Sequence, residues 1–243
     1  MRAESINWNE IMSEVGHRQF CPLAMASDVL CSRWTMMLLS ELLSGTTRFN
    51  DLRRGLPRMS PALLSKRLKE LEAAGIVLRS RATDSSDLYE YLLTEAGRAV
   101  EPIVDAMGDW GHRWVTTQAT LAHLDVKLLM WNMRRKIDPD PMPRRRSVIQ
   151  IIYRDIPPAT RNWWLIVEPN KDADLCSVDP GYDVDLYITT DLRTMTEVWM
   201  GYSAIAEAVE DGRLLLVGDK ELERTFHTWL GASRYASLEK CVA

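Results

Sequence analysis

The apolar residues in the first part of the chain recur every three to four positions, which is the spacing of amphipathic helices. The pattern predicts three short helices, over Leu23–Cys31, Trp34–Leu43 and Phe49–Leu56. Gly45 follows the second helix, where a glycine commonly ends a helix, and Pro57 closes the third. These elements indicate a small helical domain near the N-terminus.

A fourth helix is predicted over Ser60–Ala73. The Ser60 hydroxyl can accept a hydrogen bond from a free amide of the first turn, and Pro61 has no amide to leave unpaired. An apolar stripe runs along one face, and Gly75 is placed to end the helix. The stripe consists of Leu64, Leu68 and Leu71, and the opposite face carries Ala62, Lys66, Lys69 and Ala73. We therefore expect the leucines to anchor the helix and the lysines to face outward.

A hairpin and a long helix are predicted next. Residues 76–81 and 88–93 alternate between apolar and polar side chains, and the polar residues 82–87 join them as an exposed turn. The helix begins at Thr94, and Pro102 is expected to interrupt and bend it. One of its faces carries Ala99, Ile103, Met107, Trp110 and Trp114. This apolar surface exceeds what a small domain covers, so part of it is expected to contact a partner.

The second half of the chain has the pattern of an α+β domain, with strands first and helices late. Five strands are predicted, over Ser147–Arg154, Asn162–Glu168, Leu175–Val178, Val184–Thr189 and Leu214–Val217. Helices are predicted over Asp125–Ile137, Asp191–Met200, Ala204–Glu210 and Lys220–Leu230. The expected fold class is α+β, with a helical and hairpin domain at residues 1–120 and a five-stranded sheet domain at residues 121–243.

The charge of the chain is unevenly distributed. The whole chain is mildly acidic, with a formal net charge of −4 at pH 7. Between Arg48 and Arg81, however, nine basic residues face three acidic ones. A local basic segment within an acidic protein indicates an anionic partner.

The order of a short helix, a tight turn, a capped second helix and a hairpin predicts a winged helix-turn-helix. In that fold the second helix enters the major groove of DNA, and the hairpin is the wing. Base contacts are expected from Ser60, Ala62, Ser65, Lys66 and Lys69. Arg67 is expected to reach a phosphate or to brace the helix, while Arg79, Arg81 and Thr83 would contact the DNA backbone or minor groove. The alternative is an ordinary solvated helix face, which leaves the helix cap, the hairpin and the basic segment unexplained.

A series of motifs between residues 20 and 114 closely resembles the HxlR-type transcription regulators. In chain order the motifs are Cys21-Pro22, Arg33-Trp34-Thr35, Glu41-Leu42, Arg48-Phe49-Asn50-Asp51-Leu52, Met59-Ser60-Pro61, Leu64-Ser65-Lys66-Arg67-Leu68, Leu71-Glu72, Gly75-Ile76-Val77, Tyr91-Leu92-Leu93-Thr94 and Gly97. The resemblance implies a homodimer that reads a palindromic operator and represses or activates nearby genes. It also implies that Trp110 and Trp114 contribute to the dimer helices.

The four cysteines, Cys21, Cys31, Cys176 and Cys241, lie far apart and form no metal-binding spacing. They are expected to be free thiols in a reducing compartment. The absence of a secretory signal and of a membrane-length apolar run predicts a cytoplasmic protein without membrane contact. Some members of the resembled family sense oxidants through the cysteine before the proline. A thiol switch at Cys21 is therefore an alternative to a cysteine that only packs.

The segments Val184–Asp191, Trp199–Gly201 and Gly212–Asp219 resemble the sterol-carrier-protein-type domain, over about 60 residues. This resemblance implies a sheet covered by helices that encloses an apolar tunnel for a lipid or another hydrophobic molecule. The candidate pocket residues are Trp164, Met195, Trp199, Met200, Phe226 and Trp229. Ligand pockets are largely apolar and aromatic, but the same residues could fill a core or an interface.

The sequence contains no recognisable catalytic set. It has no Gly-x-Ser-x-Gly, His-Glu-x-x-His or phosphate-binding glycine motif, and its four histidines are scattered. We therefore predict no enzyme, no cofactor and no metal site. Arg144, Arg145 and Arg146 are interpreted as a solvated loop in preference to a phosphate contact.

Three functional hypotheses follow from the sequence. The leading one is a dimeric regulator on a double-stranded DNA operator, controlled by a hydrophobic small molecule in the C-terminal domain. The second is a regulator switched by the Cys21 thiol, with a structural C-terminal domain. The third is a lipid carrier or an enzyme that also has a winged helix.

Overall fold

The computed structural model describes residues 17–81 and 88–242. The chain divides into two compact units, Met1–Gly108 and Asp109–Ala243, and each is described by itself. Within the described residues, no helix is both long and apolar enough to cross a membrane.

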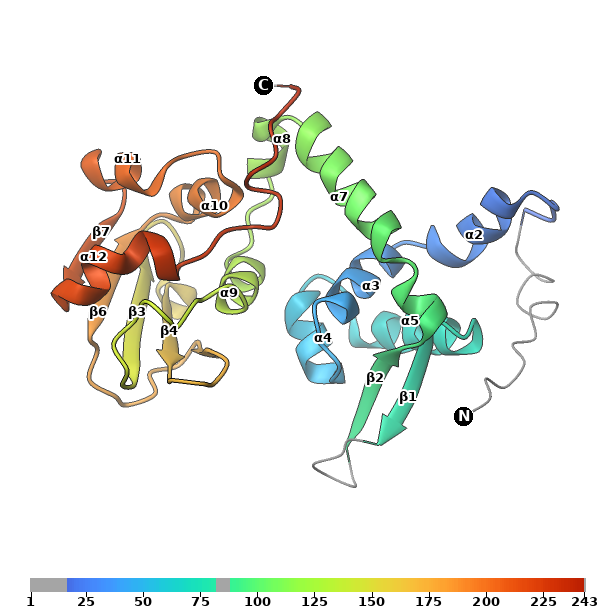
Figure 1. The fold of residues 1–243 in the computed structure, drawn as a ribbon, viewed down its shortest axis with the longest axis horizontal. Helices are drawn as coiled ribbons and strands as arrows, with labels where there is room; N and C mark the ends of the chain where they lie inside the picture. Colours follow the sequence, from blue (N-terminus) through green and yellow to red (C-terminus); the bar gives the residue numbers. More distant parts are fainter. Residues whose placement is uncertain (1–16, 82–87, 243) are drawn as a thin grey trace. The chain divides into compact units, whose positions relative to one another are not determined.

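The first unit is a winged helix-turn-helix (Figure 1). Its helices are α2 (Pro22–Leu30), α3 (Thr35–Leu43), α4 (Phe49–Gly55), α5 (Pro61–Ala73), α6 (Glu95–Arg98) and the first part of α7 (Glu101–Trp114). Strands β1 (Val77–Arg81) and β2 (Tyr89–Leu93) pair antiparallel, with Val77 opposite Leu93 and Arg81 opposite Tyr89. The four helices and the hairpin that were predicted up to residue 93 are present, and each differs from its expected bounds by only one or two residues. The turn at residues 82–87, which was also predicted, lies outside the described residues.

The helix predicted from Thr94 onward is divided into α6 and α7. The break falls at Ala99 and Val100, and Pro102 is the second residue of α7. Proline is well accommodated there, because the first turn of a helix contains amides without a partner in any case. Pro102 therefore lies just after an interruption instead of bending a continuous helix.

Thr94 connects three elements of this unit. Its hydroxyl donates to the carbonyl oxygen of Gly75 at 2.6 Å, just after α5, and accepts a hydrogen bond from the amide of Gly97 in α6 at 3.1 Å. Gly97 leaves no room for a side chain, since a Cβ atom there would lie 2.2 Å from the carbonyl oxygen of Ile76. The end of α5, the root of the wing and the start of α6 are thus held tightly together.

The second unit is built on a five-stranded sheet. Its strands are β3 (Ser147–Tyr153), β4 (Asn162–Val167), β5 (Asp174–Cys176), β6 (Leu186–Thr190) and β7 (Leu215–Gly218). The order across the sheet is β5-β4-β3-β6-β7, and the β3–β6 pair is parallel while the others are antiparallel. The predicted α+β class and the five strands are confirmed for this region.

The helices of the second unit are α8 (Thr117–Leu121), α9 (Val126–Arg134), α10 (Leu192–Met200), α11 (Ile205–Glu210) and α12 (Lys220–Trp229), with a short 3₁₀ turn at Pro158–Thr160. Aspartates begin three of the helices, because their carboxylates accept hydrogen bonds from first-turn amides. These caps are Asp125 for α9, Asp191 for α10 and Asp219 for α12. The sequence pattern did not indicate α8 or the 3₁₀ turn.

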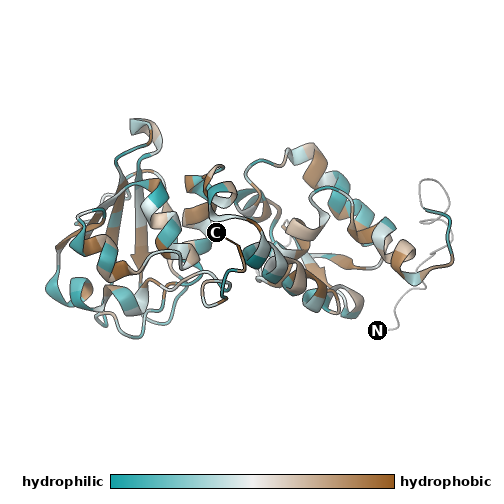
Figure 2. Cartoon of the chain, turned by 90° about the horizontal axis from the view of Figure 1, so that it is seen from above, coloured by the Kyte–Doolittle hydropathy of each residue, from teal (hydrophilic) through white to brown (hydrophobic). Residues whose placement is uncertain are grey.

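One face of the sheet forms the main core of the second unit. Ile149, Ile151 and Tyr153 alternate along β3 and are buried together with side chains from α9, α10 and α12. In Figure 2 the central strands are largely hydrophobic, while the helices alternate between hydrophobic and hydrophilic residues. Burial of the apolar face of each helix against the sheet therefore holds this unit together.

Candidate DNA-binding site

Helix α5 is fixed by its cap and by its leucine stripe. The Ser60 hydroxyl accepts a hydrogen bond from the amide of Leu63 at 3.3 Å, and Pro61 is the first residue of the helix, as the sequence predicts. Leu64, Leu68 and Leu71 are fully or almost fully buried in the core of the first unit. The opposite face of α5 is therefore the one that meets the solvent.

The exposed face of α5 carries the predicted base-contacting residues. Ala62, Lys66 and Lys69 are exposed, and Ser65 is half-buried. The Lys66 side chain is 68% exposed, and its Nζ lies 3.9 Å from the carboxylate of Glu70. An ion pair at that distance and exposure is weak. Both lysines are thus available to an anionic partner.

Arg67 is held inside the protein. Its side chain is 17% exposed, its Nε donates to the carbonyl oxygen of Arg33 at 3.2 Å, and its guanidinium is paired with Glu70. Of the two roles expected for Arg67, these contacts correspond to the brace, which ties α5 to the segment before α3.

The wing places two more of the predicted residues on the surface. Arg79 and Arg81 of β1 are exposed, and the Arg79 guanidinium lies 3.8 Å from the centre of the Tyr89 ring on β2. That stacking is a cation–π contact, which orders the side chain without neutralising its charge. Thr83 lies outside the described residues.

One arginine of the basic segment is paired with an acidic residue that lies beyond the segment in the sequence. Arg48, just before α4, approaches Glu90 of β2, with 3.6 Å between Nε and Oε1. The amide of Tyr91 also donates to the carbonyl oxygen of Thr47 at 2.8 Å, so the wing is attached to the start of α4. The sequence count did not reveal this pair, because Glu90 belongs to the second strand of the hairpin.

A second feature of the described chain is an exposed apolar stripe on α7. Ile103, Met107, Trp110 and Trp114 recur at helical spacing and are all exposed, with Trp110 at 63%. Phe20 and Leu23, before and within α2, are exposed as well. An exposed apolar stripe like that of α7 is typical of an interaction surface.

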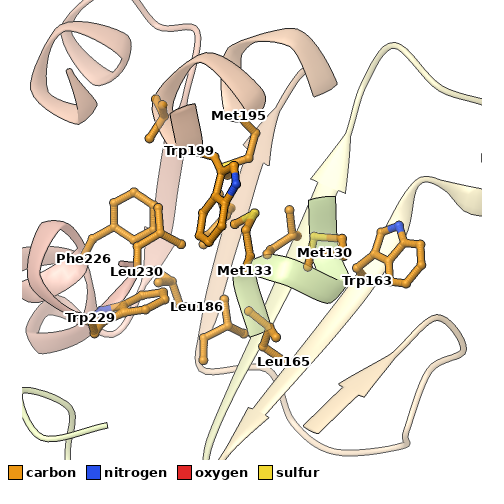
Figure 3. Close-up of a cluster of buried hydrophobic side chains, with 14 of the residues drawn as sticks. Met130, Met133, Trp163, Leu165, Leu186, Met195, Trp199, Phe226, Trp229 and Leu230 are labelled. Carbon is orange, nitrogen blue, oxygen red and sulfur yellow. The ribbon is translucent and has the colours of Figure 1, made fainter. Parts of the chain in front are cut away.

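The predicted pocket residues of the second unit occupy both faces of its sheet. Met195, Trp199, Phe226 and Trp229 are buried in the core cluster, and Met200 packs against it. Figure 3 shows Met195 and Trp199 of α10 close to Phe226 and Trp229 of α12. The rings of Phe226 and Trp229 meet edge to face with 5.0 Å between centres, and the Trp229 Nε1 donates to the carbonyl oxygen of Leu222 at 3.0 Å.

Trp164 lies apart from the other five. Its neighbours on β4, Trp163 and Leu165, belong to the core cluster, whereas Trp164 does not. Successive side chains of a strand point to opposite faces, so the sheet separates Trp164 from the core side. Trp164 therefore cannot line one cavity together with the residues of α10 and α12.

The candidate thiol Cys21 is exposed and immediately precedes α2. His17, its basic neighbour in the sequence, is engaged with the carboxylate of Asp28. Cys31 and Cys241 are also exposed, and all four cysteines are free.

Comparison with known proteins identifies relatives of the first unit. The family profile described as HxlR-like helix-turn-helix matches residues 29–119. The uncharacterized HTH-type transcriptional regulator YvaP of Bacillus subtilis is 37% identical over 98 residues, which are 40% of this chain and 91% of YvaP. A second regulator of that organism, YybR, is 39% identical over 95 residues, covering 39% of this chain and 76% of YybR.

Among solved structures, the redox regulator HypR in its reduced form aligns with 40% identity and a TM-score of 0.35. That alignment covers 37% of this chain and 90% of HypR. The family match ends at residue 119, before the five-stranded sheet begins.

Arg67 and Lys69 are both on α5 but have different surroundings. Substituting each in turn should distinguish a residue that stabilises the first unit from one that is exposed and does not. We expect Arg67→Ala to lower the stability of the first unit by about 1–2 kcal/mol, because it removes the hydrogen bond to Arg33 and the Glu70 pair. Lys69→Ala should change stability by less than about 0.5 kcal/mol, since Lys69 is exposed. Amide hydrogen exchange of residues 61–73 in the full chain measures both. Equal protection in the two variants would contradict a bracing role for Arg67.

Proposed function

Because this chain belongs to the HxlR-like helix-turn-helix family through residues 29–119, we propose that it reads a DNA operator with α5 and holds the flanking DNA with its wing. The relatives are transcriptional regulators, and such proteins are not enzymes. The observation that carries the proposal is the division of α5 into a buried leucine face and an exposed face with Lys66 and Lys69. A helix presented in this way fits the major groove, which is about 12 Å wide.

We assign each DNA contact from the position of the residue on α5 or on the wing. Ser60, Ala62, Ser65, Lys66 and Lys69 meet base edges or the adjacent phosphates, because they lie on the early and outer part of α5. Arg79 and Arg81 contact the DNA backbone or the minor groove, as does Thr83 of the turn that the sequence predicts. Arg67 positions α5 from within the protein. In this arrangement the wing contributes affinity and α5 contributes sequence specificity.

The regulator acts as a homodimer. The exposed apolar stripe of α7 and the exposed residues beside α2 supply a surface that a second copy of the chain would bury. A two-fold dimer places two α5 helices on half-sites about 34–36 Å apart, and its operator is therefore palindromic. In this proposal residues 1–120 bind DNA and dimerise, and residues 121–243 bind the effector.

The effector is a hydrophobic small molecule taken up by a sterol-carrier-like C-terminal domain. A five-stranded sheet with helices α9, α10 and α12 on one face supports this proposal, since such a domain binds its ligand between sheet and helices. Met195, Trp199, Met200, Phe226 and Trp229 remain the candidate lining residues, and Trp164 is left out because it lies on the other face. The effector must bind the DNA-bound and free arrangements with different affinity in order to shift their equilibrium.

Substitution of the α5 lysines tests the DNA-binding site. Lys66→Ala and Lys69→Ala should each weaken binding of the full chain to its upstream intergenic DNA about tenfold, and should flatten the salt dependence of the affinity. Arg224→Ala is the control, since Arg224 is an exposed arginine of α12, far along the chain from α5. Fluorescence anisotropy at several salt concentrations gives both quantities. Normal binding by both lysine variants would reject the assignment of α5.

The dimer surface is tested at Trp110. Trp110→Glu places a charge on the apolar stripe of α7, and burying an unpaired charge costs several kcal/mol. We expect the variant to be a monomer at micromolar concentration while the parent chain is a dimer, as measured by sedimentation velocity. Arg98→Glu, an exposed change in α6, should leave the dimer intact. An unchanged dimer in Trp110→Glu would exclude this surface.

A redox switch at Cys21 is the second candidate function, favoured by the exposure of this thiol beside α2. The two mechanisms respond to different treatments. A hydrophobic effector predicts that lipophilic cell extracts alter operator binding by both the parent chain and Cys21→Ser, whereas diamide alters neither. If diamide releases the parent chain from DNA, Cys21→Ser does not respond and the extracts have no effect, the thiol switch replaces the ligand mechanism. Cys241→Ser controls for reaction at another exposed cysteine.

A further inference from the structure

A polar cleft of about 440 Å³ opens at one end of the sheet in the second unit. It lies between the loop that precedes β3 and the segment that follows β4, and its volume is in the range of small-molecule sites. Its lining includes Asp140, Arg144, Arg145, Ser147, Glu168 and Asn170. None of the predicted aromatic pocket residues is in this lining.

The base of the cleft contains a buried hydroxyl. Ser147 is 1% exposed, and its Oγ has no hydrogen-bond partner among the described residues. By strand alternation Ser147 faces the same side of β3 as Ile149, and it pairs across the sheet with Val167, which also lines the cleft. Buried hydroxyls are nearly always hydrogen-bonded, so an unpaired one at the wall of a cleft points to a missing acceptor or donor.

The rim of the cleft is fixed by internal ion pairs. The Arg145 guanidinium donates to Asp185 at 2.7 Å and to Asp219 at 2.9 Å. Arg146 donates to Glu168 at 2.7 Å, and Lys171 pairs with the same carboxylate. Hydrogen bonds from Lys171 and then Arg146 hold the pKa of Glu168 below its ordinary value. The charges of Arg145 and Glu168 are therefore compensated within the protein.

Two charged side chains of the lining are not part of these ion pairs. Arg144 and Asp140 are exposed, and within residues 17–81 and 88–242 neither side chain has an ion pair or a hydrogen bond. The cleft thus presents one uncompensated cation, one uncompensated anion and one unpaired hydroxyl. A ligand that satisfies all three carries both a carboxylate and an ammonium group.

We propose that this cleft binds a small zwitterion of the amino-acid class. The ligand carboxylate accepts hydrogen bonds from the Arg144 guanidinium and the Ser147 hydroxyl, and its ammonium group donates to the Asp140 carboxylate. The lining contains no residue of α5 and none of the candidate effector-binding residues, so this proposal does not depend on the hydrophobic effector or on the operator.

Three related probes, L-alanine and the two molecules that remain when either its ammonium group or its carboxylate is removed, test the site in the full chain. L-Alanine carries both charges, propionate only the carboxylate and ethylamine only the ammonium group. Thermal unfolding and saturation-transfer NMR are measured with each probe at up to about 10 mM. At this concentration the general effect of a cosolute on protein stability is small. We expect L-alanine to raise the unfolding midpoint by about 3 °C once it exceeds its Kd tenfold, with a smaller shift for propionate and none for ethylamine.

Variants of the lining make the test specific. Arg144→Gln and Ser147→Ala should lose the response to L-alanine and to propionate, and Asp140→Asn should bind L-alanine no better than propionate. Arg224→Gln, an exposed arginine outside the cleft, should respond like the parent chain. Without any probe, Ser147→Ala should unfold at or above the midpoint of the parent chain, because it breaks no hydrogen bond within the described residues.

Three results overturn the proposal. The first is the absence of any shift or saturation transfer with the three probes, as expected if water alone occupies the cleft. The second is an L-alanine response that persists in both Arg144→Gln and Ser147→Ala. The third is a lower midpoint for Ser147→Ala without probe, which would show that the hydroxyl has a partner inside the protein. Operator binding measured on the same samples remains an independent readout of the proposed function.

Discussion

Burial of three leucines sets the orientation of α5, and the rest of the DNA-binding half depends on that orientation. Leu64, Leu68 and Leu71 are almost completely removed from water. Burying a leucine side chain stabilises a fold by roughly 1.5–3 kcal/mol, and burying an unpaired lysine charge in its place would cost several kcal/mol. The lysines of α5 therefore face the solvent because the leucines are buried. The Ser60 cap and the Arg67 contacts stabilise α5 further, but they do not decide which of its faces is buried.

In the second unit, burial of apolar side chains likewise decides which face of the sheet is covered by helices. Residues that alternate along β3 and β4 divide between two faces, and the face with Ile149 and Trp163 receives the helices. The end of this sheet is organised differently, by ion pairs from Arg145 and Arg146 instead of by apolar contact. The second unit therefore has two chemically distinct regions, an apolar interior and a polar end.

The sequence is most informative where the structural cause is local. The Ser60-Pro61 start, the leucine stripe and Asp191 at the start of α10 depend on residues within a few positions of one another. The expected bounds of α5 and α10 therefore differ from the observed ones by only one residue. The division between α6 and α7 was only partly predicted, because Pro102 is as compatible with a helix start as with a bend.

Features that depend on long-range pairing were not predictable from the pattern. The Arg67 contact with Arg33 joins residues more than 30 positions apart, and the parallel β3–β6 pairing joins strands separated by two others in the sequence. The unpaired hydroxyl of Ser147 is visible only when its surroundings are known. The position of Trp164, by contrast, could have been inferred, since strict alternation from Trp163 already places it on the other face of the sheet.

Thr94 has a mechanical consequence. One hydroxyl ties the carbonyl just after α5 to the first turn of α6, and α7 follows after only two residues. At about 1.5 Å per residue, α7 is a rod roughly 20 Å long. The Thr94 junction holds the chain in place near one end of this rod, and a tilt of the rod by a few degrees moves its far end by an ångström or more. Such a tilt acts on α5 at the Thr94 junction and through Val100 and Val104, which share a core with the α5 leucines.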